Sequence, residues 1–202
     1  MQLDFSQLDA AESYRWLSST VTPRPIAWVS TLSADGVSNL APFSFFQVIC
    51  DQPPVLMVNV GLNARGEPKD TVRNAQATGE LVIHLVSATQ AEAMNATAAS
   101  LAHGVSEFEH AGIASVPSSR VKPQRVAGAA IAFECVLEEV KPYPANDPRQ
   151  FLLFARVLLA HIDDAVMADP RHVDPAKLDL VGRLSGPWYA TTRDRFAMTR
   201  PP

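Results

Sequence analysis

The stretch from Arg24 to Phe46 constrains the fold of this 202-residue chain more than any other. Its two halves, Ile26 to Leu32 and Val37 to Phe46, are rich in β-branched and aromatic residues, which favour extended strands. Asp35-Gly36 lies between them. An Asp-Gly pair between two such runs is a strong hairpin signal, because glycine adopts a positive φ without steric cost. The sequence therefore predicts a β-hairpin here.

Small hydrogen-bonding side chains are unusually frequent in this hairpin. They surround Pro42 and comprise Ser30, Thr31, Ser38, Asn39 and Ser44. A hairpin that only fills a core does not need so many, so the pattern suits a wall that holds a polar ligand between strands. The same residue types also line ordinary turns and edge strands, and the pattern alone leaves both interpretations open.

Composition limits the class of protein. The length fits one domain with a sizeable core, and 47% hydrophobic against 19% charged residues indicates a folded globular chain. The net charge of −4 argues against nucleic acid or an anionic membrane as the main partner. Two cysteines, Cys50 and Cys135, are too few for a disulfide framework. With neither a secretory signal nor an apolar run of about 20 residues, we expect a cytoplasmic protein.

The rest of the chain reads as strands with short helices inserted. Helices are expected over 9–19, 68–77 and 89–102, with a helical turn inside a loop over 104–111. In the first helix, Asp9 is the expected N-cap, and Trp16 and Leu17 are expected on the inner face. Strands are expected over 55–60, 80–86, 129–140 and 150–162, with an extended segment over 113–123 and a polar turn around 169–174.

This order of elements predicts a mainly β fold. An antiparallel barrel with appended helices fits better than a doubly wound sheet, which needs regular βαβ alternation. We expect a single domain over 1–202, with an N-terminal helix (about 9–19) and a C-terminal extension (about 165–202).

A second polar group follows the strand over 55–60. Its members are Arg65, Lys69, Asp70, Thr71, Arg73 and Asn74, around the expected start of a helix. Cations and a hydroxyl at a helix N-terminus can hold a phosphate, because unpaired N–H groups and the helix dipole favour an anion there. Arg65 can add a bidentate contact. A solvated helix face is the alternative, and placement next to the polar hairpin favours the anion site.

Other chemistries find less support. The five histidines are dispersed without metal-ligand spacing, and His84, inside an expected strand, reads as structural. The chain has no GxSxG elbow, no GxGxxG and no Walker A motif. Cys50 is either a reactive thiol or, the favoured interpretation, a small buried hydrophobic residue.

Six segments together resemble a known family. In order they read RPIAWVST, DGVSNLAPFSFF, DQPP, KDTVRN, GELVIHL and SEFEHAG. Their order and spacing resemble the flavin reductase-like family of FMN-binding split barrels, which includes flavoredoxins and the reductase partners of two-component monooxygenases. The resemblance runs roughly from Ser13 to Tyr189. It implies an antiparallel split β-barrel, a homodimer, and FMN held non-covalently at the dimer interface.

The resemblance also implies a set of cofactor-binding residues. Along the flavin ring and ribityl chain it places Ser30, Thr31, Asn39, Ala41, Pro42 and Ser44. At the phosphate it places Arg65, Lys69 and Thr71, in agreement with the electrostatic argument. Four further residues match later family segments that approach the ring: Glu107, Phe108, Arg183 and Tyr189. In the last segment, Ser185 stands where the family pattern R-x-G-G-x-x-Y has a glycine.

The function implied is that of an NAD(P)H-dependent flavin reductase. NADH or NADPH would reduce FMN, and the electrons would pass to free flavin, oxygen, or a partner such as a monooxygenase. The cofactor carries the redox chemistry, so no catalytic side chain and no metal is expected. Two alternatives stay open: an FMN electron carrier that does not react with NAD(P)H, and a non-redox dimeric binding module.

Overall fold

Ser44 and Phe45 connect the two edge strands of the main sheet, and this short connection closes the sheet into a barrel. The computed structural model describes residues 1–201. Its seven-stranded antiparallel sheet has the order β3-β2-β6-β9-β10-β5-β4. Because β3 (Ser38–Phe43) and β4 (Phe46–Asp51) are joined by only two residues, the sheet must curl until its edges meet. A hydrogen bond of 2.8 Å from Asn59 N to Phe45 O fastens this corner.

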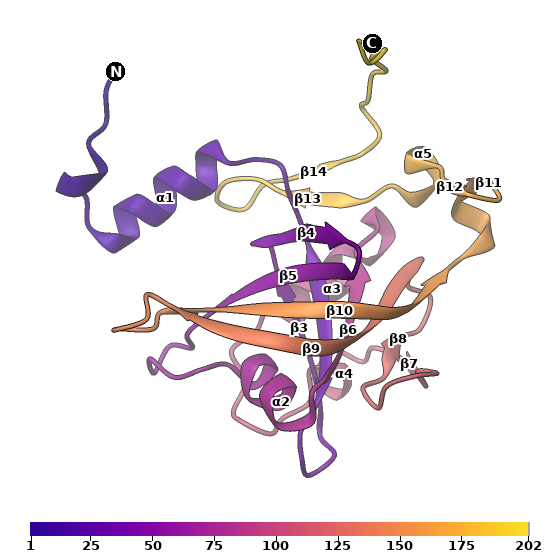
Figure 1. Ribbon diagram of the computed structural model, residues 1–202, viewed down its shortest axis with the longest axis horizontal. Helices are drawn as coiled ribbons and strands as arrows, with labels where there is room; N and C mark the ends of the chain where they lie inside the picture. The colour runs from indigo at the N-terminus through magenta and orange to yellow at the C-terminus, as the bar shows by residue number, and fades with distance from the viewer. Residues whose placement is uncertain (202) are drawn as a thin grey trace.

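The other elements surround this barrel (Figure 1). The remaining barrel strands are β2 (Ala27–Leu32), β5 (Pro54–Gly61), β6 (Glu80–Leu85), β9 (Ile131–Tyr143) and β10 (Gln150–Ile162). The helices are α1 (Ala10–Thr20), α2 (Asp70–Thr78), α3 (Ala91–Ala96), α4 (Glu107–His110) and α5 (Pro175–Leu178), with 3-10 turns at Phe5–Gln7, Ala88–Gln90 and Asp164–Val166. Short strand pairs are β7 (Ser115–Val116) with β8 (Arg125–Val126) and β11 (Met167–Asp169) with β12 (His172–Val173).

The predicted hairpin is β2 and β3. Gly36 has a φ of 83°, and Ser33 N and Val37 O close the loop over 2.9 Å. The second strand is shorter than the predicted run to Phe46. It ends at Phe43, and the chain then turns a corner and begins β4, a separate strand that the sequence analysis missed. The sequence around this corner looks like one continuous apolar strand, because the corner residues lack a turn signature.

Alternation along β2 gives the barrel two apolar faces. Ala27 and Val29 join the core inside the barrel, whereas Trp28 points to the opposite face and packs with Leu40 and Met94. Helix α2 covers one end of the inner core with Val72 and Ala75. The outer core is covered by α3 and α4. This division leaves α2 and the loop after α3 on either side of β3.

Two helices differ from their predicted bounds. The helix expected over 68–77 begins at Asp70 and ends at Thr78, where Gly79 takes a φ of 72°. The helix expected over 89–102 is confined to the 3-10 turn and α3. It ends before Thr97, whose hydroxyl donates to Met94 O (2.7 Å) and accepts from Trp28 Nε1 (2.9 Å). The helical turn predicted within 104–111 is α4.

The segment over 113–123 is pinned to the barrel by carboxylates instead of forming a long strand. Only β7 pairs, with β8. The fully buried Glu134 accepts hydrogen bonds from Ser119 N (2.8 Å) and Arg120 N (2.5 Å), and Glu80 accepts one from Lys122 N (2.8 Å). Side-chain acceptors therefore replace a sheet partner along this stretch.

Helix α1 begins as predicted, with Asp9 in a complete capping box with Glu12. The prediction that Trp16 and Leu17 form its inner face is wrong, since they are 38% and 49% exposed. Figure 1 shows the reason: α1 lies to one side of the barrel, above β5, and does not pack along it. Its buried residue is Ser18.

The C-terminal region adds strands that the sequence analysis did not predict. They are β13 (Val181–Arg183) and β14 (Tyr189–Thr191), which form a second sheet with β1 (Arg24–Pro25) in the order β1-β13-β14. Gly182 lies opposite Pro25, and a Cβ at this position would approach Pro23 Cβ to 3.0 Å. These strands are too short to leave a periodic signal in the sequence.

His84 is a structural residue, as predicted. It is fully buried in β6; Val126 N donates to its Nε2 over 2.9 Å, and its Nδ1–H donates to Trp28 O over 2.8 Å. Burial lowers the pKa of His84 to about 4, because the protonated ring would be desolvated.

Candidate functional site

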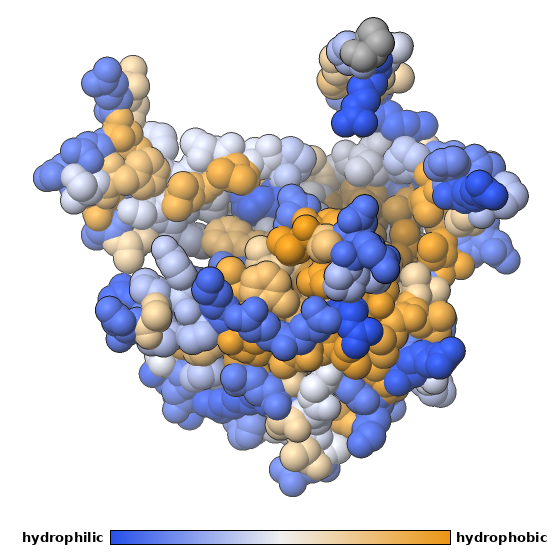
Figure 2. Space-filling view, viewed as in Figure 1, coloured by the Kyte–Doolittle hydropathy of each residue, from blue (hydrophilic) through white to orange (hydrophobic). Residues whose placement is uncertain are grey.

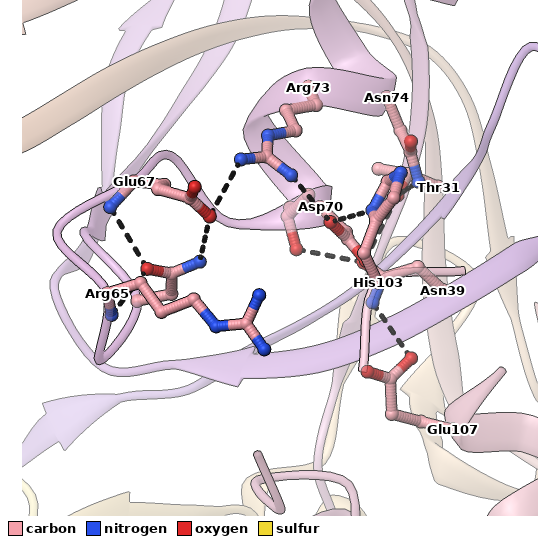
Figure 3. Close-up of polar contacts among 11 residues, drawn as sticks. Thr31, Asn39, Arg65, Glu67, Asp70, Arg73, Asn74, His103 and Glu107 are labelled. Atoms are coloured by element: carbon pink, nitrogen blue, oxygen red, sulfur yellow. Dashed lines mark hydrogen bonds and ion pairs between the residues drawn. The ribbon is translucent and has the colours of Figure 1, made fainter. Parts of the chain in front are cut away.

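A row of buried polar side chains runs from the barrel end to α4. Thr31 and Asn39 are directly opposite each other in the β2–β3 ladder. Asn39 Oδ1 accepts hydrogen bonds from Thr71 Oγ1 (2.9 Å) and Thr31 Oγ1 (3.3 Å), and Asn74 Nδ2 donates to Thr31 Oγ1 (3.1 Å). Figure 3 shows how this network ties the hairpin to α2. The small polar residues of the hairpin thus form a rigid, internally bonded wall.

Glu107 completes the row from the other side. The residue is 8% exposed, and its Oε2 accepts hydrogen bonds from Asn39 Nδ2 (2.8 Å) and Leu40 N (2.9 Å). Burial raises the pKa of Glu107, although these hydrogen bonds oppose the shift. The Glu107 carboxylate therefore holds edge strand β3 at Leu40. At Pro42 the strand has no backbone N–H that could remain unpaired.

The loop between β5 and α2 is shaped by Asn63. Its Oδ1 accepts from Arg65 N (2.9 Å) and Glu67 N (3.0 Å), while Gly66 takes a φ of 77°. Main-chain hydrogen bonds between Asn63 N and Glu67 O (2.8 Å) and a bridge from Leu62 to Pro68 complete the loop. The loop presents Arg65 as an exposed side chain beside the start of α2.

At the start of α2 the charges fall into two groups. Arg73 lies 3.2 Å from Glu67 and 3.7 Å from Asp70, so its charge is compensated, and His103 Nδ1 lies 2.6 Å from Asp70 Oδ1. Lys69 differs from Arg73. Its Nζ lies 5.6 Å from the centroid of the Phe43 ring, and partial desolvation lowers the pKa of Lys69 although the residue remains exposed.

A cavity of about 470 Å³ joins these groups. Its walls are β3, the 62–67 loop, the first turn of α2, residues 97–103 and Glu107. Within residues 1–201, neither Arg65 nor Lys69 has a carboxylate oxygen within 4.0 Å. The cavity therefore carries two cations without a direct ion pair beside a hydroxyl and amide wall, an arrangement that fits a phosphate and a polar chain.

The predicted site residues divide into those that share this cavity and those that do not. The cavity is lined by Asn39, Ala41, Pro42, Arg65, Lys69, Thr71 and Glu107. Thr31 lies directly behind Asn39 and supports it. Ser30 and Phe108 are buried outside the cavity lining, and the Ser30 hydroxyl has no hydrogen-bond partner within the described residues.

The other three predicted residues lie beside the second sheet. Ser44 Oγ accepts from Arg24 Nε over 3.4 Å, and the Arg183 guanidinium donates to the Tyr189 hydroxyl and lies 4.6 Å from its ring centroid. Ser185, in place of the family's glycine, causes no backbone strain, because among residues 1–201 the one non-glycine residue with positive φ is Asp179.

Sequence reasoning missed the contribution of the loop after α3. His103 and the stretch over 97–102 line the cavity, and His103 contacts Asp70 across 33 positions of sequence. No local sequence pattern predicts a contact between residues so far apart in the chain. The role of Asn63 in shaping its loop could have been predicted from the sequence, since an asparagine three residues before a glycine is typical of a tight polar loop.

Residues 18–176 match the model of the flavin reductase like domain. The chain belongs to the flavin reductase-like family. This membership supports a flavin-related oxidoreductase that binds flavin.

Solved structures of family members agree with the barrel. The chain is 32% identical to nitrilotriacetate monooxygenase component B from Bacillus cereus, with a TM-score of 0.93 and coverage of 98% of each chain. A flavin reductase with a split barrel domain from Shewanella frigidimarina has a TM-score of 0.82 at 20% identity, covering 100% of this chain and 98% of that chain. The predicted antiparallel split β-barrel and the family resemblance are thus confirmed.

A curated relative extends the similarity over the whole chain. An uncharacterized protein of Halalkalibacterium halodurans is 38% identical over 203 residues, which cover 100% of this chain and 97% of the relative. Separately, no helix among residues 1–201 combines the length and apolar character needed to cross a membrane.

Proposed function

We propose that this chain binds FMN in the cavity between β3 and α2 and acts as an NAD(P)H-dependent flavin reductase. The observation that carries the proposal is the pair of cations without a direct ion pair, Arg65 and Lys69, beside the start of α2. Lys69 is partly desolvated without an opposite charge, and a phosphate would supply that charge. The N–H groups of the first turn of the helix add donors.

The remaining cavity residues would hold the rest of the cofactor. Asn39, Ala41 and Pro42 form a strand edge that is fixed on both sides, by α2 and by Glu107. A wall with satisfied internal hydrogen bonds orients a ligand without reorganising. When bound, FMN supplies the redox chemistry, which is hydride uptake from NADH or NADPH and electron release to an acceptor. The chain supplies orientation and charge, and no side chain needs to act as a nucleophile.

The acceptor belongs to the same proposal. Nitrilotriacetate monooxygenase component B, at 32% identity, is by its name one part of a monooxygenase. We infer that this chain likewise passes electrons to a partner protein, to free flavin or to another acceptor.

We also propose a homodimer. Exposed apolar side chains gather over the strands at the front of Figure 2. Val48 and Ile49 on β4 are 63% and 49% exposed, and Leu158 and Ile162 on β10 are 39% and 42% exposed. An apolar edge strand favours pairing with another surface, and a second copy is the partner always present.

One experiment tests the proposed function directly. The protein is reconstituted with FMN, desalted, and its visible absorbance is recorded anaerobically before and after addition of NADH or NADPH. Bleaching of the flavin band is the expected result. A bound flavin that stays oxidised with both reductants would favour an electron carrier. A colourless protein that also fails to reduce added free flavin would contradict the proposal.

A further inference from the structure

One wall of the cavity between β3 and α2 is a loop, residues 97–103, that follows α3. Another wall is the first turn of α2, which contributes Asp70. The His103 ring reaches from the loop to the helix, and its Nδ1 lies 2.6 Å from Asp70 Oδ1 (Figure 3). Among residues 1–201, this contact is the one hydrogen bond or ion pair that a side chain of the stretch 98–105 makes. It joins two walls of the cavity.

Both ends of this loop are anchored in the core. At its start Thr97, which is 2% exposed, accepts a hydrogen bond of 2.9 Å from the buried Trp28 Nε1. Beyond its end, the buried Glu107 is bonded to β3. The residues between, 98–105, are exposed apart from the half-buried Leu101. A segment with anchored ends and an exposed middle opens locally at a small cost in free energy, without unfolding the rest of the protein.

A tight turn places His103 at the tip of the loop. Val105 N donates to Ala102 O over 3.2 Å, and Gly104, inside the turn, takes a φ of 78°. A Cβ on Gly104 would meet no atom within 4 Å, so the backbone conformation and not close packing requires glycine here. The turn thus directs one side chain of the loop, the His103 ring, toward α2.

The carboxylate that receives His103 is itself held in place. Arg73 lies 3.7 Å from Asp70 and 3.2 Å from Glu67, so Asp70 is part of a small network on α2 and the preceding loop. The His103 side chain is 65% exposed, whereas that of Asp70 is 24% exposed. Ion pairs with one exposed partner contribute little free energy. The contact can therefore break and re-form while both anchored ends stay in place.

We propose that His103 is a positioning residue that fastens the loop over the cavity and sets the rate at which flavin enters and leaves. The inference rests on the proposed flavin site and adds a means of regulating it. Flavin passes this wall when the contact to Asp70 is broken, as substrates pass the mobile loops of many enzymes. His103 acts through the loop and not by touching flavin, so the contact forms in the empty and in the loaded protein. Weakening it speeds entry and release by the same factor and leaves the affinity unchanged.

Stopped-flow quenching of flavin fluorescence tests this inference. Mixing with FMN gives the association rate constant, and rapid dilution of the complex gives the dissociation rate constant. His103→Ala should raise both about threefold, the scale of one exposed ion pair, and should leave the Kd unchanged. His103→Asn should restore the wild-type rates, because the asparagine amide can donate to Asp70 in place of Nδ1–H. Lys69→Ala should behave differently: loss of a direct contact raises the Kd, chiefly through faster release.

His172→Ala is the matched control. It removes another exposed histidine–aspartate pair, with Asp169 at 2.9 Å, which joins β11 to β12 and does not line the cavity. Both rate constants should equal those of the wild type. The inference is overturned if His103→Ala has the rates of this control, or if it raises the Kd as a direct contact would. In both cases the wild type still binds FMN and the proposed function stands, whereas a wild type that takes up no FMN overturns both.

Discussion

Asn39 Nδ2 and Glu107 Oε2 are joined by a hydrogen bond of 2.8 Å although 68 positions of sequence separate the two residues. The same carboxylate oxygen accepts from Leu40 N over 2.9 Å. One buried side chain of α4 therefore satisfies two donors of the edge strand β3. This relationship fixes the strand that lines the proposed flavin cavity, and it makes Glu107 a stabilising residue independently of any cofactor.

Removing the Glu107 carboxylate should destabilise the protein. Glu107→Ala leaves the Leu40 N–H and the Asn39 amide unpaired and buried, so the free energy of unfolding should fall by about 1–3 kcal/mol. Glu107→Gln keeps an acceptor oxygen and removes the desolvated charge, so it should cost less than Glu107→Ala. Urea unfolding followed by circular dichroism measures both.

Glu109→Ala serves as the control for Glu107, since Glu109 is exposed on the same short helix. It should change stability by less than about 0.5 kcal/mol. If Glu107→Ala matched this control, the carboxylate would not be what holds β3.

Lys69 should contribute directly to FMN affinity. Lys69→Ala removes one of the two cavity cations that make no direct ion pair, and loss of one charge-assisted contact should raise the Kd for FMN about tenfold. Quenching of flavin fluorescence at low ionic strength gives the affinity, and added salt should narrow the difference between variant and wild type.

Lys141→Ala is the comparison for Lys69, because Lys141 is exposed on β9 and does not line the cavity. An FMN affinity of Lys69→Ala equal to that of Lys141→Ala at low salt would remove Lys69 from the phosphate site. The assignment would then rest on Arg65 and the helix N-terminus.

His84 should make stability fall on acidification. Its pKa in the folded protein is about 4 against 6.5 in the unfolded chain, so between these values the unfolded state binds more protons. Stability should therefore decrease as the pH falls from about 6.5 to 4, by about 3 kcal/mol from this one residue. His84→Gln should reduce that pH dependence, as measured by urea unfolding at pH 4.5 and pH 7. His110→Gln, at an exposed position, should retain the full dependence.

Prediction from sequence succeeded where the signal was local. The Asp35-Gly36 turn, the Asp9 cap and the long strands of the barrel each depend on neighbouring residues, and the structure contains them. It failed for contacts that only the closed barrel creates. The corner at Ser44 that separates β3 from β4 is an example, because an apolar run does not reveal where a strand changes edges.

The candidate site shows the same division. Lys69 and Thr71 were recognisable from their position at a helix start, and the cavity brings them together with Asn39. The role of His103 depends on the path of the loop after α3. Helix α3 ends at Ala96, six residues before the end of the helix expected over 89–102. Arg183 lies in a different cavity from Asn39, and this separation could not be inferred from a shared family pattern.

The apolar edge at β4 should determine the oligomeric state. Val48 is 63% exposed on a strand that pairs only with β5 in the main sheet, so a carboxylate placed there would be buried if a second copy covers this face. We expect wild-type protein to elute as a dimer in size-exclusion chromatography with light scattering, and Val48→Asp to shift the population toward monomer. Val105→Asp makes the same change at a 44% exposed position in a loop and should remain dimeric. A wild-type monomer at high protein concentration, or a Val48→Asp dimer as stable as the control, would show that β4 is not the interface.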